Sequence, residues 1–283
     1  MKIDDLPSLR SVLEANRLAP TKALGQNFLL DLNLTARIAR SAESLLACNV
    51  VEVGPGPGGL SRALLQSSAQ TVLAIEKDTR TTPILEALAQ TDEGQEKAFR
   101  VLFDDALEVD LLAAIPAPRA VVANLPYNVA TPSLIKWLKD LWLEPGAYRS
   151  LTLMFQREVV DRIVARPGDK AYGRLAVLTA LTVASAERQF DVPASAFTPP
   201  PKVTSAIVRL DGRAEVPGPI ELFNKIERVT AAAFGQRRKM LRQSLKSAVP
   251  QAEAFLEGLG IKPTARAEEL PPEDFLAMAS ALD

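Results

Sequence analysis

The sequence predicts an α/β protein with a doubly wound parallel sheet, followed by a small helical domain. Three observations support this fold class. Short apolar runs rich in β-branched residues alternate with segments of helical spacing through most of the chain. A cluster of glycines directly follows the first run, and the last 65 or so residues show helical patterns alone. Strands that alternate with helices are typical of sheets whose ligands bind beyond the carboxyl ends of the strands.

The expected strands are short, apolar runs without the alternation of a half-exposed sheet, as in buried parallel strands. They cover residues 49–53, 71–76, 98–103, 119–123 and 150–155. Helical spacing predicts helices over 59–67, 78–90 and 131–140. Two later runs, 181–190 and 203–210, are expected to form a hairpin that closes one edge of the sheet.

The composition changes after this hairpin. Residues 211–219 (DGRAEVPGP) are polar and broken by glycine and proline, as in a linker. We therefore expect one domain over 1–210, in which 1–30 form an N-terminal extension, and a helical domain over 219–283.

The bulk composition excludes several classes of protein. The chain of 283 residues is 47% hydrophobic, enough for a sizeable core, but no stretch has the roughly 20 apolar residues of a membrane span. Because a secretory signal is also not recognisable, we expect a soluble, cytoplasmic protein without a membrane partner. Cys48 is the single cysteine and histidine is absent, which excludes a thiolate metal cage and every histidine-dependent catalytic arrangement. We expect no metal, and chemistry that needs little proton transfer.

The glycine cluster GPGPGG at 54–59 follows the first strand and precedes a helix. Such a loop lets a ligand approach the backbone and the free N–H groups of the helix start. Because Gly54, Gly56 and Gly59 also satisfy the dinucleotide fingerprint, a dehydrogenase is one alternative, and a glycine turn packed on the sheet is another. Pro55 and Pro57 favour S-adenosylmethionine, because they remove N–H donors that a pyrophosphate would use.

Two acidic residues follow the next strands. Glu76 ends the second strand, where its carboxylate can accept hydrogen bonds from both hydroxyls of a ribose. Asp105 follows the third strand and is interpreted either as an acceptor for the amine of a cofactor adenine or as a helix N-cap.

The tetrapeptide Asn124-Leu125-Pro126-Tyr127 follows the fourth strand. The amine of adenine is a poor nucleophile, and the Asn124 side-chain oxygen with the Leu125 carbonyl can accept its two N–H bonds. Pro126 stiffens the turn, and Tyr127 offers a face for base stacking. Phe197, in the proline-rich segment AFTPPPKV, is expected to be the second face of an aromatic clamp. The alternatives are an ordinary strand-to-helix turn and a phenylalanine that plugs the domain edge. A dehydrogenase has no use for this combination.

The net charge of −1 conceals a basic segment. Residues 225–246 contain seven basic residues and one acidic residue, whereas seven acidic residues lie between 252 and 283. A helix would place Arg238, Arg242 and Lys246 in one stripe at i, i+4 and i+8, with Arg237 and Lys239 alongside. Such a stripe can bind RNA phosphates; a solvated helix face is the alternative, and the acidic residues beyond 252 can instead neutralise it.

Motifs throughout the chain together resemble the small-subunit ribosomal RNA adenine dimethyltransferase family. They are KALGQNFLLD at 22–31, VEVGPGPGGLS, AIEKD, DDAL, NLPYN, RPGDKAYGRLAV, FTPPPKV and AFGQRRKMLRQSL. Ser61, Ala176 and Thr204 depart from the family pattern, but none of them lies on a proposed catalytic atom.

The resemblance implies a Rossmann-like, seven-stranded class I methyltransferase domain with a helical rRNA-docking domain. It implies dimethylation of N6 of two adjacent adenosines near the 3′ end of 16S rRNA, within the assembling small ribosomal subunit, and a role in ribosome biogenesis; we expect a monomer. The alternatives are another RNA or DNA adenine methyltransferase, or an assembly factor that acts mainly by binding. By position, the cofactor contacts would be Gln26, Asn27, Leu29, Gly54, Gly56, Glu76, Asp105 and Asn124.

Overall fold

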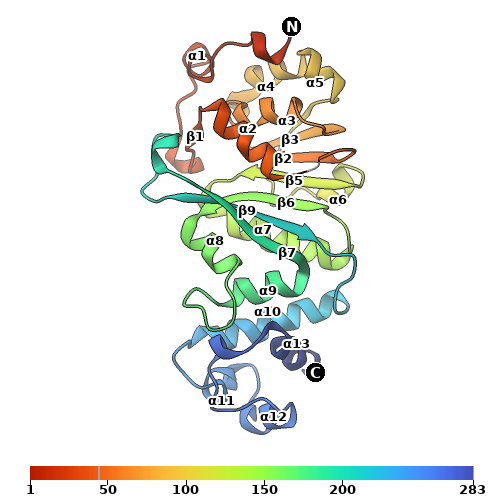
Figure 1. Ribbon diagram of the computed structural model, residues 1–283, viewed down its shortest axis with the longest axis vertical. Coiled ribbons are helices and arrows are strands. Elements are labelled where there is room, and N and C mark those ends of the chain that lie inside the picture. Colours follow the sequence, from red (N-terminus) through yellow and green to blue (C-terminus); the bar gives the residue numbers. More distant parts are fainter. Residues whose placement is uncertain (44, 283) are drawn as a thin grey trace.

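A seven-stranded sheet forms the centre of the protein, whose computed structural model describes residues 1–43 and 45–282 (Figure 1). The strand order is β4-β3-β2-β5-β6-β9-β7. The pairs from β4 to β6 are parallel, whereas β9 is antiparallel to both β6 and β7. The strands of this sheet are β2 (Asn49–Val53), β3 (Thr71–Glu76), β4 (Arg100–Phe103), β5 (Arg119–Asn124), β6 (Ser150–Gln156), β7 (Val183–Val192) and β9 (Ser205–Gly212). A separate two-stranded ladder pairs β1 (Phe28–Leu29) with β8 (Phe197–Thr198).

The helices cover both faces of the sheet. They are α1 (Leu9–Ala15), α2 (Leu32–Ser41), α3 (Gly59–Leu65), α4 (Thr82–Ala89), α5 (Asp92–Glu96), α6 (Leu111–Ala114), α7 (Tyr127–Leu143), α8 (Arg157–Ile163), α9 (Arg174–Thr182), α10 (Ile220–Gly235), α11 (Leu241–Ser244), α12 (Ala252–Gly258) and α13 (Pro272–Ser280).

Strand β2 illustrates why the sheet needs two helical layers. Successive side chains of a strand point to opposite faces. Val51 belongs to a core that includes Leu134 of α7, whereas Val50 belongs to a second core with Leu64 of α3. Because both faces are covered, the run lacks the alternation of a half-exposed strand and was predictable as a buried one.

The predicted order of strands and helices is confirmed. The observed bounds of β2 and β3 are those predicted, and the other parallel strands differ from the prediction by two residues or fewer. The expected hairpin is present as β7 and β9, with β7 at the edge. One segment differs: the predicted strand 181–190 begins at Val183, because the apolar run before it forms α9 and continues directly into β7.

The C-terminal helices share a core with the sheet. In Figure 1 they extend the molecule beyond the β7 edge, and α10 lies next to α9. Phe223 and Ile226 of α10 are fully buried in the same cluster as Trp137 of α7. Trp142 packs edge-to-face on Phe223 at 5.3 Å between ring centroids and donates its indole N–H to the Pro219 carbonyl at 2.9 Å. This packing joins residues before 210 and residues after 219 in one core. The division into two domains at these positions stays a prediction.

Among the described residues, none of the helices has the length and apolar composition required to span a membrane.

Candidate active site

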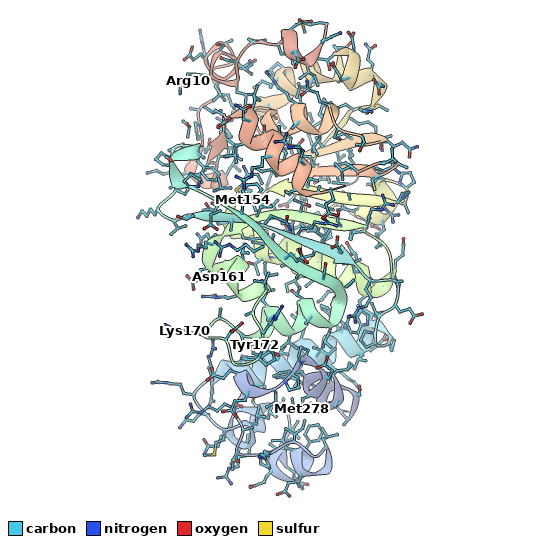
Figure 2. All side chains as sticks on the ribbon, in the orientation of Figure 1. Arg10, Met154, Asp161, Lys170, Tyr172 and Met278 are labelled. Atoms are coloured by element: carbon cyan, nitrogen blue, oxygen red, sulfur yellow. The ribbon has the colours of Figure 1, made fainter. Side chains whose placement is uncertain are left out.

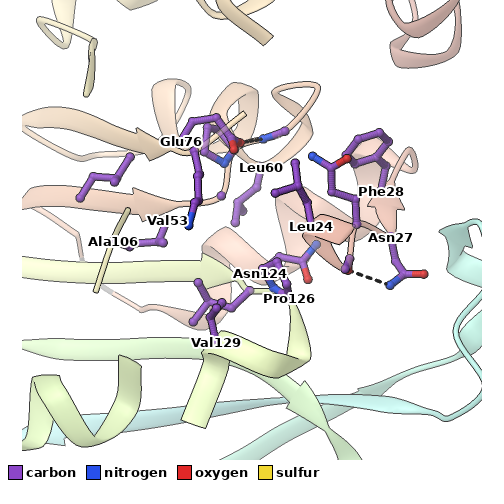
Figure 3. Close-up of a pocket in the computed structure, with 18 of the residues that line it drawn as sticks. Leu24, Asn27, Phe28, Val53, Leu60, Glu76, Ala106, Asn124, Pro126 and Val129 are labelled. Carbon is purple, nitrogen blue, oxygen red and sulfur yellow. Dashed lines mark hydrogen bonds between the residues drawn. The ribbon is translucent and has the colours of Figure 1, made fainter. Parts of the chain in front are cut away.

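A cavity lies at the carboxyl ends of β2 and β5, where the sheet order reverses direction from β2 to β5 (Figure 3). In doubly wound sheets this switch point is the usual ligand crevice. The structure brings all twelve residues predicted for the cofactor and the target base to the wall of this one cavity. They are Gln26, Asn27, Leu29, Gly54, Gly56, Glu76, Asp105, Asn124, Leu125, Pro126, Tyr127 and Phe197.

The glycine loop crosses the top of β2 in a conformation that side chains disfavour. Gly54 and Gly56 have φ values of +73° and +53°. A Cβ on Gly56 would lie 3.3 Å from the ring of Phe28. The loop therefore accepts the aromatic ring of β1 directly against its backbone. Phe28 also lines the cavity. This role could not be predicted from the sequence, because a phenylalanine in an apolar segment carries no polar signal.

Glu76 is held by the loop it faces. The side chain is 7% exposed, and its two oxygens accept hydrogen bonds from the backbone N–H groups of Gly56 at 3.0 Å and Asp78 at 2.8 Å (Figure 3 draws the first). Burial raises the pKa of this carboxyl, although the two amide bonds oppose the change. Each oxygen keeps a free lone pair, so the carboxylate can still accept bonds from hydroxyl groups of a ligand.

Gln26 positions the N-terminal segment. Its amide nitrogen donates to Asp78 at 2.8 Å, and its oxygen accepts the backbone N–H of Thr21 at 2.9 Å. Arg80 donates to both oxygens of Asp78, at 2.6 Å to the oxygen that Gln26 also binds and at 2.8 Å to the other, and these bonds lower the pKa of Asp78. The Gln26 amide thus forms the hydrogen bonds that hold residues 21–26 over the cavity. A direct contact of Gln26 with a cofactor stays a prediction.

Asp105 caps a turn at 106–108, not a helix, and its role as an acceptor for a cofactor adenine stays a prediction. One oxygen accepts the backbone N–H of Leu107 at 3.0 Å, as a capping residue does, and the other forms an ion pair with Lys77 at 2.7 Å. The hydrogen bond from Lys77 lowers the pKa of Asp105, so the carboxylate stays charged at the cavity wall.

The turn at Asn124 leaves its acceptors free. Neither the Asn124 side chain nor the Leu125 carbonyl has a hydrogen-bond partner within residues 1–43 and 45–282. Pro126 caps α7 and accepts the N–H groups of Val129 and Ala130 at 3.1 Å each, so the helix starts without using the Leu125 carbonyl. Two acceptors at the cavity wall are therefore available to a ligand that carries N–H bonds.

Tyr127 and Phe197 reach the cavity from different elements. Tyr127 is the first residue of α7, and its hydroxyl lies 2.7 Å from the hydroxyl of Ser205 at the start of β9. Phe197 lies on β8 opposite Leu29 of β1 and is 4% exposed. It both lines the cavity and packs in a core cluster, so the clamp and plug interpretations stay open for its ring.

Glu52 is a buried acid behind the glycine loop. It lies on β2 two residues before Gly54 and is 1% exposed. Burial raises its pKa to about 8, although Ser61 beside it on α3 favours the charged form. At neutral pH this carboxyl is mostly protonated. The depth of Glu52 could not be predicted from the sequence, since a single acid inside an apolar strand gives no sign of how deeply it is buried.

The helical stripe predicted at 238–246 was wrong. α10 ends at Gly235 and α11 begins at Leu241, so Arg238 and Arg242 do not lie on one helix. The cause is tertiary: the N–H groups of Leu241 and Arg242 donate to the carbonyls of Ala265 and Pro263, at 2.8 and 3.0 Å. These donors are therefore unavailable to a continuing helix.

Two of the five basic residues are paired with acids of their own chain. Arg237 pairs with Glu268 at 2.6 Å and Arg242 pairs with Glu253 at 2.9 Å. The acidic C-terminal segment thus neutralises part of the basic segment. Arg238, Lys239 and Lys246 form no ion pair among the residues that the structure describes.

A second basic segment contacts the turn at 236–240 that follows α10. The loop 164–173 between α8 and α9 carries exposed Arg166 and Lys170, and Figure 2 shows Lys170 beside the junction with the C-terminal helices. Arg237 donates to the Asp169 carbonyl at 3.4 Å, and the N–H of Gly168 donates to the Glu268 carbonyl at 2.8 Å. The first contact joins the loop to the 236–240 turn, and the second joins it to the C-terminal segment at Ala267–Glu269.

No cluster of three or more potential metal ligands occurs among the described residues.

Comparison with known proteins gives consistent similarities. A family model described as ribosomal RNA adenine dimethylase matches residues 19–283. Ribosomal RNA small subunit methyltransferase A of Ruegeria sp. (strain TM1040) is 54% identical over 282 residues, which cover 99% of this chain and 98% of that protein. The protein of the same name from Azorhizobium caulinodans is 56% identical over 281 residues, with 99% and 94% covered.

Two solved structures extend the comparison to the fold. A dimethyladenosine transferase from Plasmodium falciparum superposes with a TM-score of 0.71 at 24% identity, over 88% of this chain and 94% of that chain. The 23S rRNA methyltransferase ErmE gives a TM-score of 0.64 at 30% identity, over 91% and 100% of the two chains. The chain therefore has the class I methyltransferase fold expected from the sequence.

Proposed function

The chain belongs to the ribosomal RNA adenine dimethylase family, and we propose that it uses S-adenosylmethionine to dimethylate N6 of adenine in small-subunit ribosomal RNA. One observation of the structure carries this proposal furthest. The free acceptors of Asn124 and Leu125 lie at the wall of the same cavity as the glycine loop and Glu76. An amine with two N–H bonds is the group that such a pair of acceptors fits.

The residues of the cavity fit S-adenosylmethionine. The buried Glu76 carboxylate retains acceptor capacity for two ribose hydroxyls, and Asp105 is a charged acceptor within reach of the same cavity. The backbone at Gly54 and Gly56 has no Cβ to obstruct a close approach. S-adenosylmethionine supplies, when bound, a methyl group that is already activated by its sulfonium. The protein therefore has to position the amine rather than provide a strong base.

Asn124 and Leu125 prepare the adenine amine for transfer. The lone pair of N6 is delocalised into the ring, and acceptors aimed at the two N–H bonds favour a geometry in which this pair is available. They also stabilise the positive charge that develops on N6 as the new N–C bond forms. One N6 proton leaves at each transfer, and no histidine exists to take it. The Asn124 oxygen and the Leu125 carbonyl accept hydrogen bonds from the N–H groups of N6 while it carries positive charge, and the proton then passes to solvent water.

The RNA is held by its backbone while the base enters the cavity. We assign phosphate contacts to Arg238, Lys239 and Lys246, which carry no ion pair among the described residues. Arg237 and Arg242 contribute less, because Glu268 and Glu253 neutralise them. The target is 16S rRNA within an assembling small subunit in the cytoplasm, and the protein acts as a monomer with a role in ribosome biogenesis.

One experiment tests the reaction and the target together. The protein is incubated with labelled S-adenosylmethionine and small subunits that lack the modification, and the labelled nucleotides are mapped. The proposal expects dimethyladenosine at two adjacent positions near the 3′ end of the 16S rRNA. Label in naked DNA or at unrelated adenosines would favour another adenine methyltransferase.

An Asn124→Ala variant distinguishes catalysis from a binding role. Removing this acceptor should reduce the single-turnover rate by about a hundredfold or more, as loss of one transition-state hydrogen-bond partner does in other enzymes. Its affinity for small subunits should be unchanged. Subunit binding with no transfer by the wild-type protein would instead support an assembly factor that acts mainly by binding.

A further inference from the structure

The hydroxyl of Ser205 forms a hydrogen bond with the hydroxyl of Tyr127, whose ring lines the cavity. Tyr127 and Ser205 are 78 residues apart in the chain, and their hydroxyl oxygens are 2.7 Å apart. The Tyr127 side chain is partly buried, and burial raises the pKa of its phenol, so this hydroxyl is neutral at physiological pH. The bond therefore joins two uncharged groups, one fully buried and one partly buried.

Ser205 is held more firmly than Tyr127. It is fully buried at the start of β9, where it pairs with Gln156 of β6 on one side and Val192 of β7 on the other. The preceding carbonyl, of Thr204, accepts the N–H of Arg157 at 3.0 Å. Three neighbouring segments thus fix the position of the serine, whereas Tyr127 is the first residue of a helix and has two side-chain torsions.

We propose that Ser205 is a positioning residue for methyl transfer: its hydroxyl fixes the direction of the Tyr127 ring so that the target adenine stacks beside Asn124. This inference rests on the proposed function. The hydroxyl lies on the ring axis, so the bond restricts the swing of the ring about the Cα–Cβ bond and leaves rotation about the Cβ–Cγ bond free. The bond therefore determines where the ring lies in the cavity, and the base that stacks on the ring sets how its faces are turned.

The geometry separates base placement from RNA docking. Phosphate contacts in the C-terminal part decide how strongly the RNA binds, whereas the Tyr127 ring determines how often the bound base is aligned. A misplacement of about 1 Å can lower a rate by roughly a hundredfold. Loss of one neutral hydrogen bond has a smaller effect, of about tenfold.

The test compares Ser205→Ala, Tyr127→Phe and the double variant in single-turnover transfer to small subunits. Each single variant should slow transfer by about tenfold, with KM for subunits and Kd for the cofactor within about twofold of the wild type. The double variant should be no slower than either single variant, because both remove the same bond. Rates that multiply in the double variant would overturn the proposal, as would a Ser205→Ala rate equal to that of the wild type.

Ser133→Ala is the matched control. Ser133 is also a buried serine, it lies on the same helix as Tyr127, and its hydroxyl donates to the Val129 carbonyl at 2.9 Å. Its removal breaks a buried bond of α7 without touching the tyrosine. Transfer by this variant should match the wild type. An equal loss in Ser133→Ala and Ser205→Ala would mean that helix stability causes the effect, and would overturn the proposal.

A spectroscopic readout tests the bond without relying on activity. The chain has three tyrosines, so protein labelled with ¹³C at tyrosine Cζ gives three assignable signals. Ser205→Ala should move the Tyr127 signal alone, because Tyr148 and Tyr172 keep their bonds to Asp140 and Leu270. An unmoved Tyr127 signal would mean that Ser205 does not hold the Tyr127 hydroxyl, and would overturn the proposal. A wild-type protein that transfers no methyl group to adenine would instead overturn the proposed function, and with it any role of the bond between Tyr127 and Ser205 in transfer.

Discussion

Replacing the buried Glu52 by glutamine should change how the stability of the protein depends on pH. The carboxyl has a pKa of about 8 in the folded protein, raised by burial, against 4.5 in an unfolded chain. The folded state therefore binds more protons than the unfolded state between these two values. Stability must fall as the pH rises through this window, and the contribution of Glu52 is complete only below it.

The two pKa values set the size of the effect. Each pH unit between them lowers the free energy of unfolding by up to about 1.4 kcal/mol, so the full window corresponds to a limit of about 5 kcal/mol. Between about pH 5 and about pH 7.5, we expect roughly 3 kcal/mol. Glutamine is neutral at every pH, and the Glu52→Gln variant should lack this contribution. The variant should gain stability relative to the wild type as the pH rises.

Urea unfolding at several pH values measures this difference. The free energy of unfolding is extrapolated to zero urea for the wild type and for Glu52→Gln, and the two are subtracted at each pH. The subtraction removes the contributions of other titrating groups. Glu86→Gln, at an exposed position of α4, is the control for the substitution itself. A difference between the wild type and Glu52→Gln that is the same at both ends of the pH range would refute the assignment of a protonated acid to this site.

Three further outcomes follow from the site. Glu76→Ala should weaken S-adenosylmethionine binding by about 1.5–3 kcal/mol, because two hydrogen bonds to a charged group are lost; calorimetry that finds unchanged affinity in a folded variant would remove Glu76 from the cofactor site. Gly56→Ala should destabilise the fold by about 1–2 kcal/mol, through its positive φ and the added Cβ at 3.3 Å from the Phe28 ring, as measured by thermal unfolding. Arg238→Ala should flatten the log–log salt dependence of subunit binding by about one unit, whereas Arg242→Ala should change it less, since Glu253 already neutralises that arginine. Equal slopes in these two variants would contradict the distinction.

Local patterns were sufficient to predict the sheet and the cavity. Strands β2 and β3 are buried on both faces, and this burial favours the largely apolar runs, without alternation, from which they were predicted. Because the carboxyl ends of β2, β3 and β5 meet at one edge, residues at or just after these ends, such as Gly54, Glu76 and Asn124, had to lie together. The positions of these residues in the chain were therefore enough to predict that they lie together in the folded protein.

Contacts distant in sequence decided what could not be predicted. The break before Leu241 depends on the Ala265 carbonyl, 24 positions later, and helical spacing contains no sign of it. The pairing of Arg242 with Glu253 was left open as neutralisation by the acidic segment, because charge balance does not specify geometry. The bond between Tyr127 and Ser205 likewise joins a helix start to a strand start that are adjacent only after folding.

The core shared by the sheet and α10 has a consequence for how a target is chosen. Phe223 and Ile226 are fully buried against α7 and α9, so the C-terminal helices cannot swing as an independent body without exposing apolar surface. The turn that carries Arg238 and the turn that carries Asn124 are thereby kept at a constant separation. We expect this separation to act as a spacer: once the RNA backbone is docked, only a nucleotide at one distance along it reaches the cavity. Two neighbouring adenosines can then be served in succession by a small shift of the RNA, with no rearrangement of the protein.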